Sequence, residues 1–207
     1  LCGLDEGQTE ADLSGKYLGP IDARLLAREL TTGNVSASLT ELNIAGNNLG
    51  KDGAVAVSEA LNVNASLTSI DLSNNRLEKE SAVALAKSLN VNASITKLNV
   101  LSNSIGDEGY EMLTQVAEAK GILTLVGFEE GQTEADLRGK GLGPIDAKLI
   151  ARELTTGFVS ASLTSADLSS NNLGLDQNYD PDSSGIEAIA AALNVNASMK
   201  KMNVLSS

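Results

Sequence analysis

Histidine and tryptophan are absent from the 207-residue sequence, and cysteine occurs once, at Cys2. Without histidine, the chain has neither a His general base nor a His metal ligand. A single cysteine excludes an intramolecular disulfide and a cluster of zinc-binding cysteines. Neither a Gly-rich phosphate loop nor a nucleophile motif occurs. The sequence therefore predicts no enzymatic activity, no cofactor and no metal.

Long apolar runs and positive charge are also scarce. No segment has transmembrane length, no signal peptide is recognisable, and 15 Lys and Arg residues face 27 Asp and Glu residues, a net charge of −12. This charge repels nucleic-acid phosphates and anionic lipids and attracts basic proteins, although it is also an ordinary route to solubility. We expect a protein partner, basic in one of these two interpretations, because charge alone selects no partner; we also expect no nucleic-acid binding and no membrane insertion. The scarcity of cysteine favours a reducing, cytoplasmic location.

Aromatic residues make up only 2% of a chain that is 42% hydrophobic, so its core must consist of similar layers of Leu, Ile, Val and Ala. Three consecutive segments align, starting at Leu39, Leu67 and Ile95, with spacings of 28 and 27 residues. Each has apolar residues at relative positions 1, 4, 6 and 11 and Asn at position 9, and then changes to helical spacing. One strand and one helix per unit predict a right-handed coil of parallel strands.

The asparagine at position 9 has a physical reason. The chain turns away from a parallel sheet at this point and leaves backbone groups that need partners inside the coil. A stacked Asn amide can bond such groups in adjacent units. We therefore predict that Asn47, Asn75, Asn103 and Asn171 form an internal ladder with a structural role.

The pattern L-x-x-L-x-L-x-x-N-x-L, in units of about 28 residues, resembles that of leucine-rich repeats. The long helical second half of each unit is similar to the ribonuclease-inhibitor-like class, which includes repeat domains of intracellular innate-immune receptors. The resemblance covers nearly the whole chain and implies an α/β solenoid, or horseshoe, with parallel strands on its concave face and helices on its convex face. It also implies a protein-interaction or scaffold module, without identifying the partner.

In addition to the short repeat, the sequence has a longer duplication. Residues 3–33 match residues 127–157 at an offset of 124. In both copies a lysine, Lys16 or Lys140, replaces the ladder asparagine. Pro20 and Pro144 lie where the first turn of a helix is expected.

We expect one continuous array over residues 1–207, with an irregular junction at residues 122–131. Only 10 residues separate Ile122 from Gln132, which is enough for a strand and a turn but not for a helix. Either this is a shortened unit without a helix, or the chain forms a local hairpin. Both ends of the sequence fall within a unit, so we expect a fragment of a longer chain or assembly.

Side chains between the apolar strand positions should point to the concave face. Acidic residues predominate there, and Leu101, Val126 and Phe128 would add a small apolar spot. We hypothesise that this face docks a basic or mixed partner; the alternative is a solvated face whose partner binds elsewhere. The predicted protein-binding residues are Glu10, Asp12, Glu41, Asn43, Asp71, Lys97, Asn99, Leu101, Phe128, Glu134, Asp136, Arg138, Asp167 and Lys201.

The unit that starts at Leu163 has 36 residues, and its extra segment is rich in aspartate. Six residues have the ligand spacing of an EF-hand calcium loop, but Pro181 stands where the motif has glycine. The favoured interpretation is a surface loop that caps the following helix, expected over Gly185 to Leu193. The six residues are Asp176, Asn178, Asp180, Asp182, Ser184 and Glu187.

Two further functions stay open. The chain could be the regulatory or sensor arm of a larger receptor or enzyme, or a calcium-responsive surface protein. Secretion would make four N-x-S tripeptides into glycosylation acceptors, although periodicity alone explains their recurrence. Their asparagines are Asn34, Asn64, Asn92 and Asn196.

Overall fold

The computed structural model describes residues 3–33, 35–176 and 178–204, and the chain divides into two compact units, Leu1–Leu125 (unit 1) and Val126–Ser207 (unit 2). The boundary falls within the irregular junction that the sequence places at residues 122–131. Asn34 lies outside the described residues. Among those that are described, no helix combines the length and the apolar composition needed to cross a membrane.

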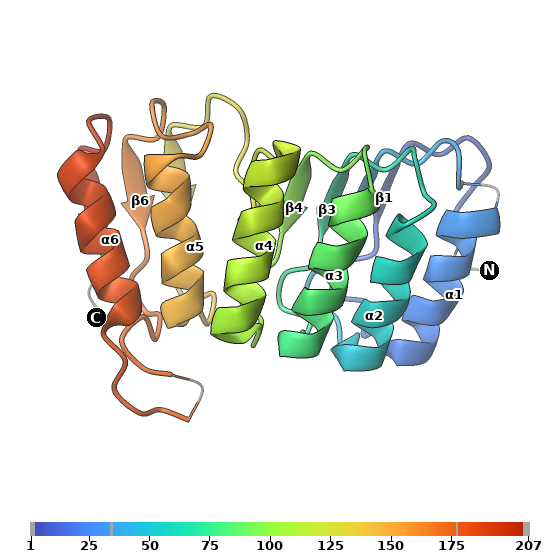
Figure 1. Ribbon diagram of the computed structural model, residues 1–207, viewed down its shortest axis with the longest axis horizontal. Coiled ribbons are helices and arrows are strands. Elements are labelled where there is room, and N and C mark those ends of the chain that lie inside the picture. Colours follow the sequence, from blue (N-terminus) through green and yellow to red (C-terminus); the bar gives the residue numbers. More distant parts are fainter. Residues whose placement is uncertain (1–2, 34, 177, 205–207) are drawn as a thin grey trace. The chain divides into compact units, whose positions relative to one another are not determined.

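Unit 1 has a four-stranded parallel sheet with its strands in chain order, and its helices lie side by side along one side of that sheet (Figure 1). The register joins equivalent residues of successive repeats, as in Glu10 to Glu41 and Leu42 to Ile70. The elements are β1 (Glu10–Asp12), α1 (Pro20–Thr32), β2 (Glu41–Asn43), α2 (Gly50–Leu61), β3 (Ser69–Asp71), α3 (Lys79–Val91), β4 (Lys97–Asn99) and α4 (Gly106–Lys120).

Unit 2 has the same architecture on a smaller scale, with a three-stranded parallel sheet in the order β5-β6-β7. Its elements are β5 (Glu134–Asp136), α5 (Pro144–Thr155), β6 (Ser165–Asp167), α6 (Ser184–Val195) and β7 (Lys201–Asn203). As predicted, Pro20 and Pro144 begin α1 and α5. The prediction of an α/β solenoid built from parallel strand-and-helix repeats is confirmed.

Small residues allow neighbouring helices to pack closely. A Cβ atom added at Gly53 would lie 2.9 Å from the Cβ atom of Ala23, and one added at Gly109 would lie 2.7 Å from that of Ala82. Both separations are shorter than a carbon–carbon contact allows. Glycine at these two helix positions therefore sets the distance between adjacent repeats.

The predicted asparagine ladder is confirmed. Asn47 Nδ2 donates hydrogen bonds to the carbonyl oxygens of Leu13, in the preceding repeat, and Ile44, in its own, at 2.9 Å each. Asn75, Asn103 and Asn171 make the same pair of contacts. These amides bond the carbonyl groups that the strands leave unpaired where the chain turns.

A second asparagine ladder, which the sequence does not predict, lies before the strands. Asn92 Nδ2 donates to the carbonyl oxygens of Leu61 and Asn64 at 2.8 and 2.9 Å, and its Oδ1 accepts from the amides of Ser94 and Ile95. Asn64 and Asn196 make equivalent bonds. The asparagines of these N-x-S tripeptides thus have a structural role in the folded chain.

The end of unit 1 has a short paired segment in place of the strand that the sequence predicts from Ile122 onward. The amide of Leu123 donates to the carbonyl of Thr96 at 2.8 Å, and Thr124 forms an isolated parallel bridge with Lys97. The amide of Val100 donates to the carbonyl of Leu125 at 3.1 Å. The sheet of unit 1 is therefore extended by a bridge that no helix accompanies before the unit ends.

Candidate functional site: the strand face

The exposed side of each sheet, opposite the helices, is the candidate site. In unit 1 the middle residue of every strand is buried, so the first and third residues point away from the core. We call these first and third side chains the strand face. In unit 1 they form two columns. The first column consists of Glu10, Glu41, Ser69 and Lys97, and the second column consists of Asp12, Asn43, Asp71 and Asn99. In unit 2 the first column consists of Glu134, Ser165 and Lys201, and the second column consists of Asp136, Asp167 and Asn203.

The side chains of the second column are hydrogen-bonded to the backbone of their own chain. Asp71 Oδ1 accepts the amide of Ser73 at 2.8 Å, and Asn43 Oδ1 accepts that of Ala45 at 3.0 Å. Asp12, Asn99, Asp136 and Asp167 each bond the amide two residues ahead in the same way. Aspartate and asparagine are equivalent as acceptors, so this column has a local structural role that the sequence interpretation missed.

Serine hydroxyls strengthen this arrangement at two positions. Hydrogen bonds from Ser14 lower the pKa of Asp12, and hydrogen bonds from Ser169 lower the pKa of Asp167. In each case the bonded form is the carboxylate. Asp71 has a further partner, because Asn99 Nδ2 donates to its Oδ2 at 2.9 Å.

The first column contains the exposed carboxylates that do not bond the backbone two residues ahead. Glu10 and Glu41 are both exposed and occupy adjacent register positions of β1 and β2. Neighbouring strands lie about 4.8 Å apart, so the two like charges stand side by side. Within the part of the chain that the structure describes, neither side chain forms an ion pair. Glu134 holds the equivalent exposed position in unit 2.

The predicted apolar spot is wrong, because the structure buries it. Leu101, Val126 and Phe128 are 4%, 3% and 3% exposed. The alternation that assigns side chains to the strand face applies only in extended chain, and β4 ends at Asn99, two residues before Leu101. Phe128 lies outside any strand. Leu101 and Phe128 therefore cannot serve as exposed anchors for a partner.

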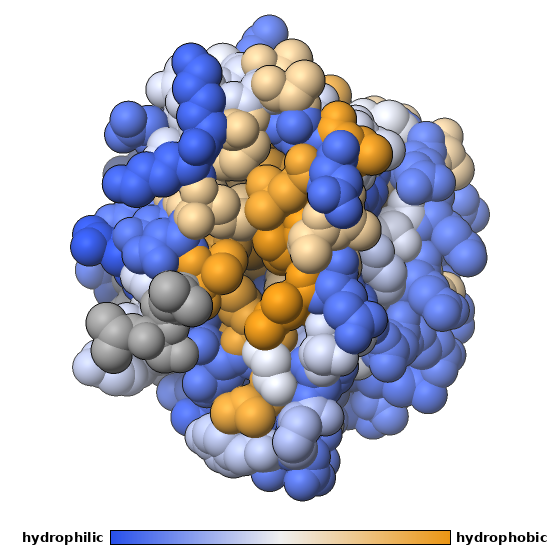
Figure 2. All heavy atoms as spheres, turned by 90° about the vertical axis from the view of Figure 1, so that its left-hand side faces the viewer, coloured by the Kyte–Doolittle hydropathy of each residue, from blue (hydrophilic) through white to orange (hydrophobic). Residues whose placement is uncertain are grey.

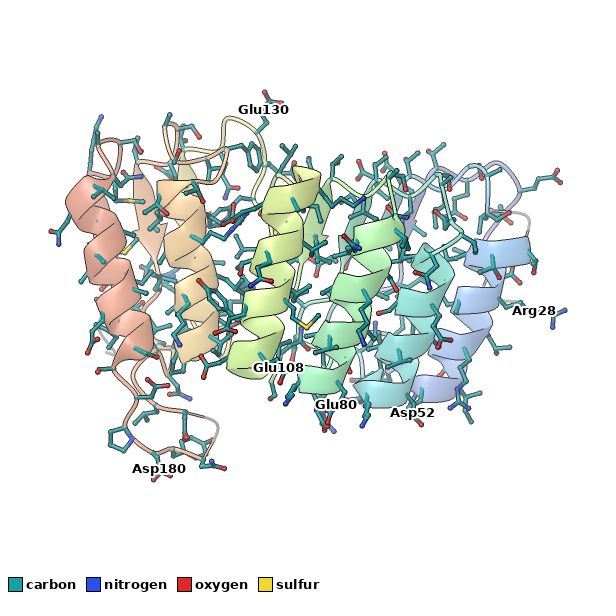
Figure 3. All side chains as sticks on the ribbon, in the orientation of Figure 1. Arg28, Asp52, Glu80, Glu108, Glu130 and Asp180 are labelled. Carbon is teal, nitrogen blue, oxygen red and sulfur yellow. The ribbon has the colours of Figure 1, made fainter. Side chains whose placement is uncertain are left out.

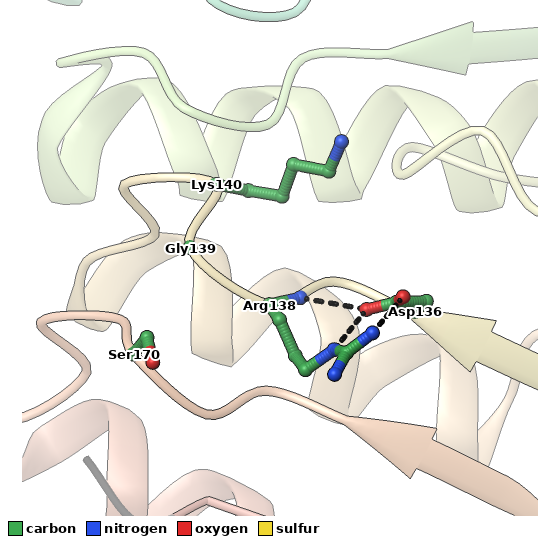
Figure 4. Close-up of a pocket in the computed structure, with 5 residues that line it drawn as sticks. All are labelled: Asp136, Arg138, Gly139, Lys140 and Ser170. Carbon is green, nitrogen blue, oxygen red and sulfur yellow. Dashed lines mark hydrogen bonds and ion pairs between the residues drawn. The ribbon is translucent and has the colours of Figure 1, made fainter. Parts of the chain in front are cut away.

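Arg138 distinguishes the strand face of unit 2 from that of unit 1. It replaces Ser14 of the first duplicated copy and donates to both carboxylate oxygens of Asp136, from Nε at 2.9 Å and from Nη2 at 2.8 Å (Figure 4). Arg138 Nε is also 3.8 Å from Asp167 Oδ2. These contacts line one side of an open pocket of about 430 Å³, completed by Gly139, Lys140 and Ser170.

An Arg138→Ser variant, which restores the residue of the first copy, should raise the pKa of Asp136. That pKa is lowered from 3.8 to about 2, chiefly by the guanidinium hydrogen bonds and secondarily by the backbone amide of residue 138. A depressed carboxyl pKa contributes stability that is present above pH 3.8 and is lost as the pH falls toward 2. Carboxyl-detected NMR titration should therefore show a higher midpoint in the variant, with Asp12 unchanged as an internal control. An unchanged Asp136 midpoint would contradict the assignment to Arg138.

In the aspartate-rich loop before α6, two carboxylates accept hydrogen bonds from the backbone of the loop or of the first turn of the helix. Asp176 Oδ1 accepts the amides of Asn178 and Asp180, and Asp182 Oδ1 accepts that of Ser184. Ser183 Oγ donates to Glu187 Oε1 at 2.6 Å in the first turn of α6, which begins at Ser184. No group of three or more acidic or cysteine side chains able to hold a metal ion is found among the described residues. The loop precedes α6 as expected, but the predicted cap differs: Ser183 at the N-cap makes no side-chain hydrogen bond to the helix backbone, and Asp182 instead bonds the amide of Ser184.

Comparison with known proteins agrees with this geometry. A family model described as Leucine Rich repeat matches residues 35–58, 63–86 and 91–113, which cover much of the second, third and fourth repeats of unit 1. Among solved structures, the tropomodulin C-terminal domain of Caenorhabditis elegans is similar with a TM-score of 0.51 and 17% sequence identity, over 62% of this chain and 77% of that chain. At this identity the likeness shows the fold alone. No curated protein matches the sequence.

Proposed function

Three tandem segments of this chain are leucine-rich repeats, and from that premise we propose that it is a non-catalytic protein-interaction module whose strand face docks a basic segment of a protein partner. Arrays of this kind generally mediate protein–protein interaction, because stacked repeats offer an extended surface. The proposal concerns which surface is used and what chemistry it selects.

The observation that carries the proposal is the pair Glu10 and Glu41. Adjacent exposed carboxylates without a cationic partner repel each other and bring no stability to the sheet. A lysine or arginine from a partner, placed between the two carboxylates, would be attracted to both and would offset their mutual repulsion. The second column, by contrast, is explained by its backbone hydrogen bonds, so we assign recognition to the first column rather than to all the acidic residues.

The strand face of unit 2 has a different local chemistry. Glu134 repeats the exposed glutamate, while Arg138 places a guanidinium on Asp136 where the first duplicated copy has Ser14. We therefore propose a partner segment that is mainly basic where it meets unit 1. Steering by the net charge of −12 would speed its association and make that rate fall with salt.

Charge reversal of Glu10, Glu41 and Glu134 to Lys should abolish partner retention. The test immobilises the folded chain, passes lysate from its own source over it at about 0.15 M ionic strength and identifies retained proteins by mass spectrometry. The matched control reverses Glu59, Glu111 and Glu118, exposed glutamates on α2 and α4, and changes the net charge equally.

We expect at least one protein that the native chain and the helix variant retain and that the strand-face variant does not retain. Equal retention by all three, or equal loss in both variants, would assign binding to another surface or to net charge alone. The strand-face variant should stay folded, since none of the three glutamate side chains is buried.

A further inference from the structure

Three of the four N-x-S tripeptides have their asparagine in the second asparagine ladder. These are Asn64, Asn92 and Asn196. An N-x-S tripeptide is the acceptor motif for N-linked glycosylation, which joins a bulky sugar to the side-chain nitrogen of the asparagine. The hydrogen bonds and the burial of that nitrogen therefore determine whether the folded chain accepts the modification.

The side-chain nitrogen of Asn92 uses both of its hydrogen atoms. It donates to the carbonyl oxygen of Leu61 at 2.8 Å and to that of Asn64 at 2.9 Å. A primary amide has two N–H donors, and the bond to a sugar replaces one of them. Glycosylation of Asn92 would therefore leave one buried carbonyl group without its donor. The same holds for Asn64, which donates to the carbonyl oxygens of Leu30 and Ser36 at 2.9 and 3.2 Å.

These hydrogen bonds also join each repeat to the helix before it. Leu30 lies in the last turn of α1, and Leu61 is the last residue of α2. The last four carbonyl groups of a helix have no partner within that helix. Asn64 and Asn92 supply the partner from the following repeat. A sugar on either nitrogen would therefore disturb the junction between two repeats and not only a local turn.

Asn64 and Asn92 are also closed off from solvent, at 4% and 7% exposed. A sugar ring is much larger than the hydrogen atom that it replaces, and it needs open space beside the nitrogen. In the folded chain the preceding repeat fills that space, with the carbonyl oxygen of Leu61 only 2.8 Å from Asn92 Nδ2. The folded repeats therefore have no room for a glycan at these two positions.

Asn196 makes the same bonds but is half-buried. Its side-chain nitrogen donates to the carbonyl oxygens of Leu154 and Ser160 at 2.7 and 3.0 Å. It belongs to the repeat of α6, whose outer apolar side chains are open to solvent together with those of β7 (Figure 2). The loss of a hydrogen bond applies to all three asparagines, while the lack of room applies to Asn64 and Asn92.

The serine of the tripeptide is engaged as well. Ser94 Oγ donates to Asn92 Oδ1 at 3.2 Å, and Ser66 Oγ donates to the carbonyl oxygen of Ser36 at 3.1 Å. The acceptor motif requires this hydroxyl group in addition to the asparagine. Both groups that define the motif are therefore held within the fold.

We propose that N-glycosylation of the second ladder and folding of the repeats exclude each other, so that this chain folds in a compartment without N-glycosylation. A glycan joined before folding would prevent the ladder from closing, and a folded chain presents neither Asn64 nor Asn92 to an enzyme. The same exclusion opposes the interpretation as a calcium-responsive surface protein of a cell that glycosylates. This proposal does not depend on the function of the strand face.

Production of the chain in a eukaryotic host, with and without a secretion signal, tests the proposal. All versions carry Asn34→Gln, which removes the fourth tripeptide. The acceptor chain has no other change. The acceptor-free chain also has Ser66→Ala, Ser94→Ala and Ser198→Ala, which remove the motif but keep the ladder asparagines. Limited proteolysis separates folded chains from unfolded ones, and mass spectrometry of the peptides locates the glycans.

The acceptor chain should fold when it is made without the signal and should mostly fail to fold when it is made with the signal. Its glycans at Asn64 and Asn92 should occur only on protease-sensitive chains. The acceptor-free chain should give nearly the same folded yield with and without the signal. This ratio of yields corrects for any loss of stability caused by the serine substitutions, because both productions use the same variant.

Gly131→Asn in the acceptor-free chain is the control for a glycan at an open position. It makes residues 131–133 an N-x-T acceptor. Gly131 is exposed, and a Cβ atom added there would meet nothing within 4 Å. Its φ of 72° is a conformation that asparagine adopts more readily than most other residues with a side chain. Figure 3 shows the neighbouring Glu130 projecting from this loop. This variant should carry a glycan at position 131 on protease-resistant chains.

Three results would overturn the proposal. Glycans at Asn64 or Asn92 on protease-resistant chains would show that the folded repeats accommodate them. Equal ratios of folded yield for the acceptor and acceptor-free chains would show that these sites do not affect folding in a glycosylating compartment. A Gly131→Asn variant that loses its folded yield with the signal would show that any glycan blocks folding, whatever its position.

Discussion

An Asn75→Ala variant should lose about 3 kcal/mol of unfolding free energy. Asn75 is fully buried, and its Nδ2 donates to the carbonyl oxygens of Ile44, Leu72 and Ser73 at 2.8, 3.2 and 3.0 Å. Alanine removes these donors and leaves buried carbonyl groups without them, and it also leaves a cavity between two repeats. Urea denaturation followed by circular dichroism measures the change.

Asn48→Ala is the matched control for this variant. Asn48 is exposed, and its backbone amide, which the substitution leaves in place, makes its contact with the carbonyl of Leu18. The control should change the unfolding free energy by less than about 0.5 kcal/mol. A similar loss in both variants would show that any asparagine substitution in this turn is destabilising and that the ladder is not the cause.

An Asn92→Ala variant should have a loss of similar size, about 3 kcal/mol, at the other end of the repeat. Its side chain donates to the carbonyls of Leu61 and Asn64 and accepts from the amides of Ser94 and Ile95. Four backbone groups from two repeats thus depend on one amide. The same urea titration gives the magnitude.

Asn90→Ala controls for composition near the same helix end, because Asn90 is exposed in the last turn of α3 and alanine favours helix. We expect it to be neutral or slightly stabilising. If Asn92→Ala were also neutral, the second ladder would be a consequence of the fold and not one of its supports.

The fold could be predicted from the sequence because its signals repeat. The change from strand to helical spacing recurs in each repeat, and the ladder asparagines Asn47 and Asn75 recur at the same position of the repeat. The structural role predicted for a residue in one repeat is therefore supported by the equivalent residue in the next repeat. The second ladder has an equal signal in Asn64, Asn92 and Asn196, but periodicity alone explains why the N-x-S pattern recurs and does not identify the backbone groups that these asparagines bond.

The candidate site was harder to predict, for a geometric reason. Alternation assigns side chains correctly within the three-residue strands but fails beyond them, which is why Leu101 was assigned to the surface although it is buried. Periodicity also could not separate Glu10, whose carboxylate is exposed, from Asp12, whose carboxylate bonds the backbone two residues ahead. Asp and Asn replace each other along the second column, and this exchange indicates that the position needs a hydrogen-bond acceptor and not a charge.

Carbodiimide cross-linking of the chain to the protein that it retains shows whether the strand face contacts the partner, because this reagent joins carboxylates only to amines that touch them. If the strand face docks the partner, links should join Glu10, Glu41 and Glu134 to lysines of the partner, and they should weaken at high salt as contacts between exposed charges do. Links confined to helix carboxylates such as Glu59 and Glu111, with none on the strand face, would contradict it.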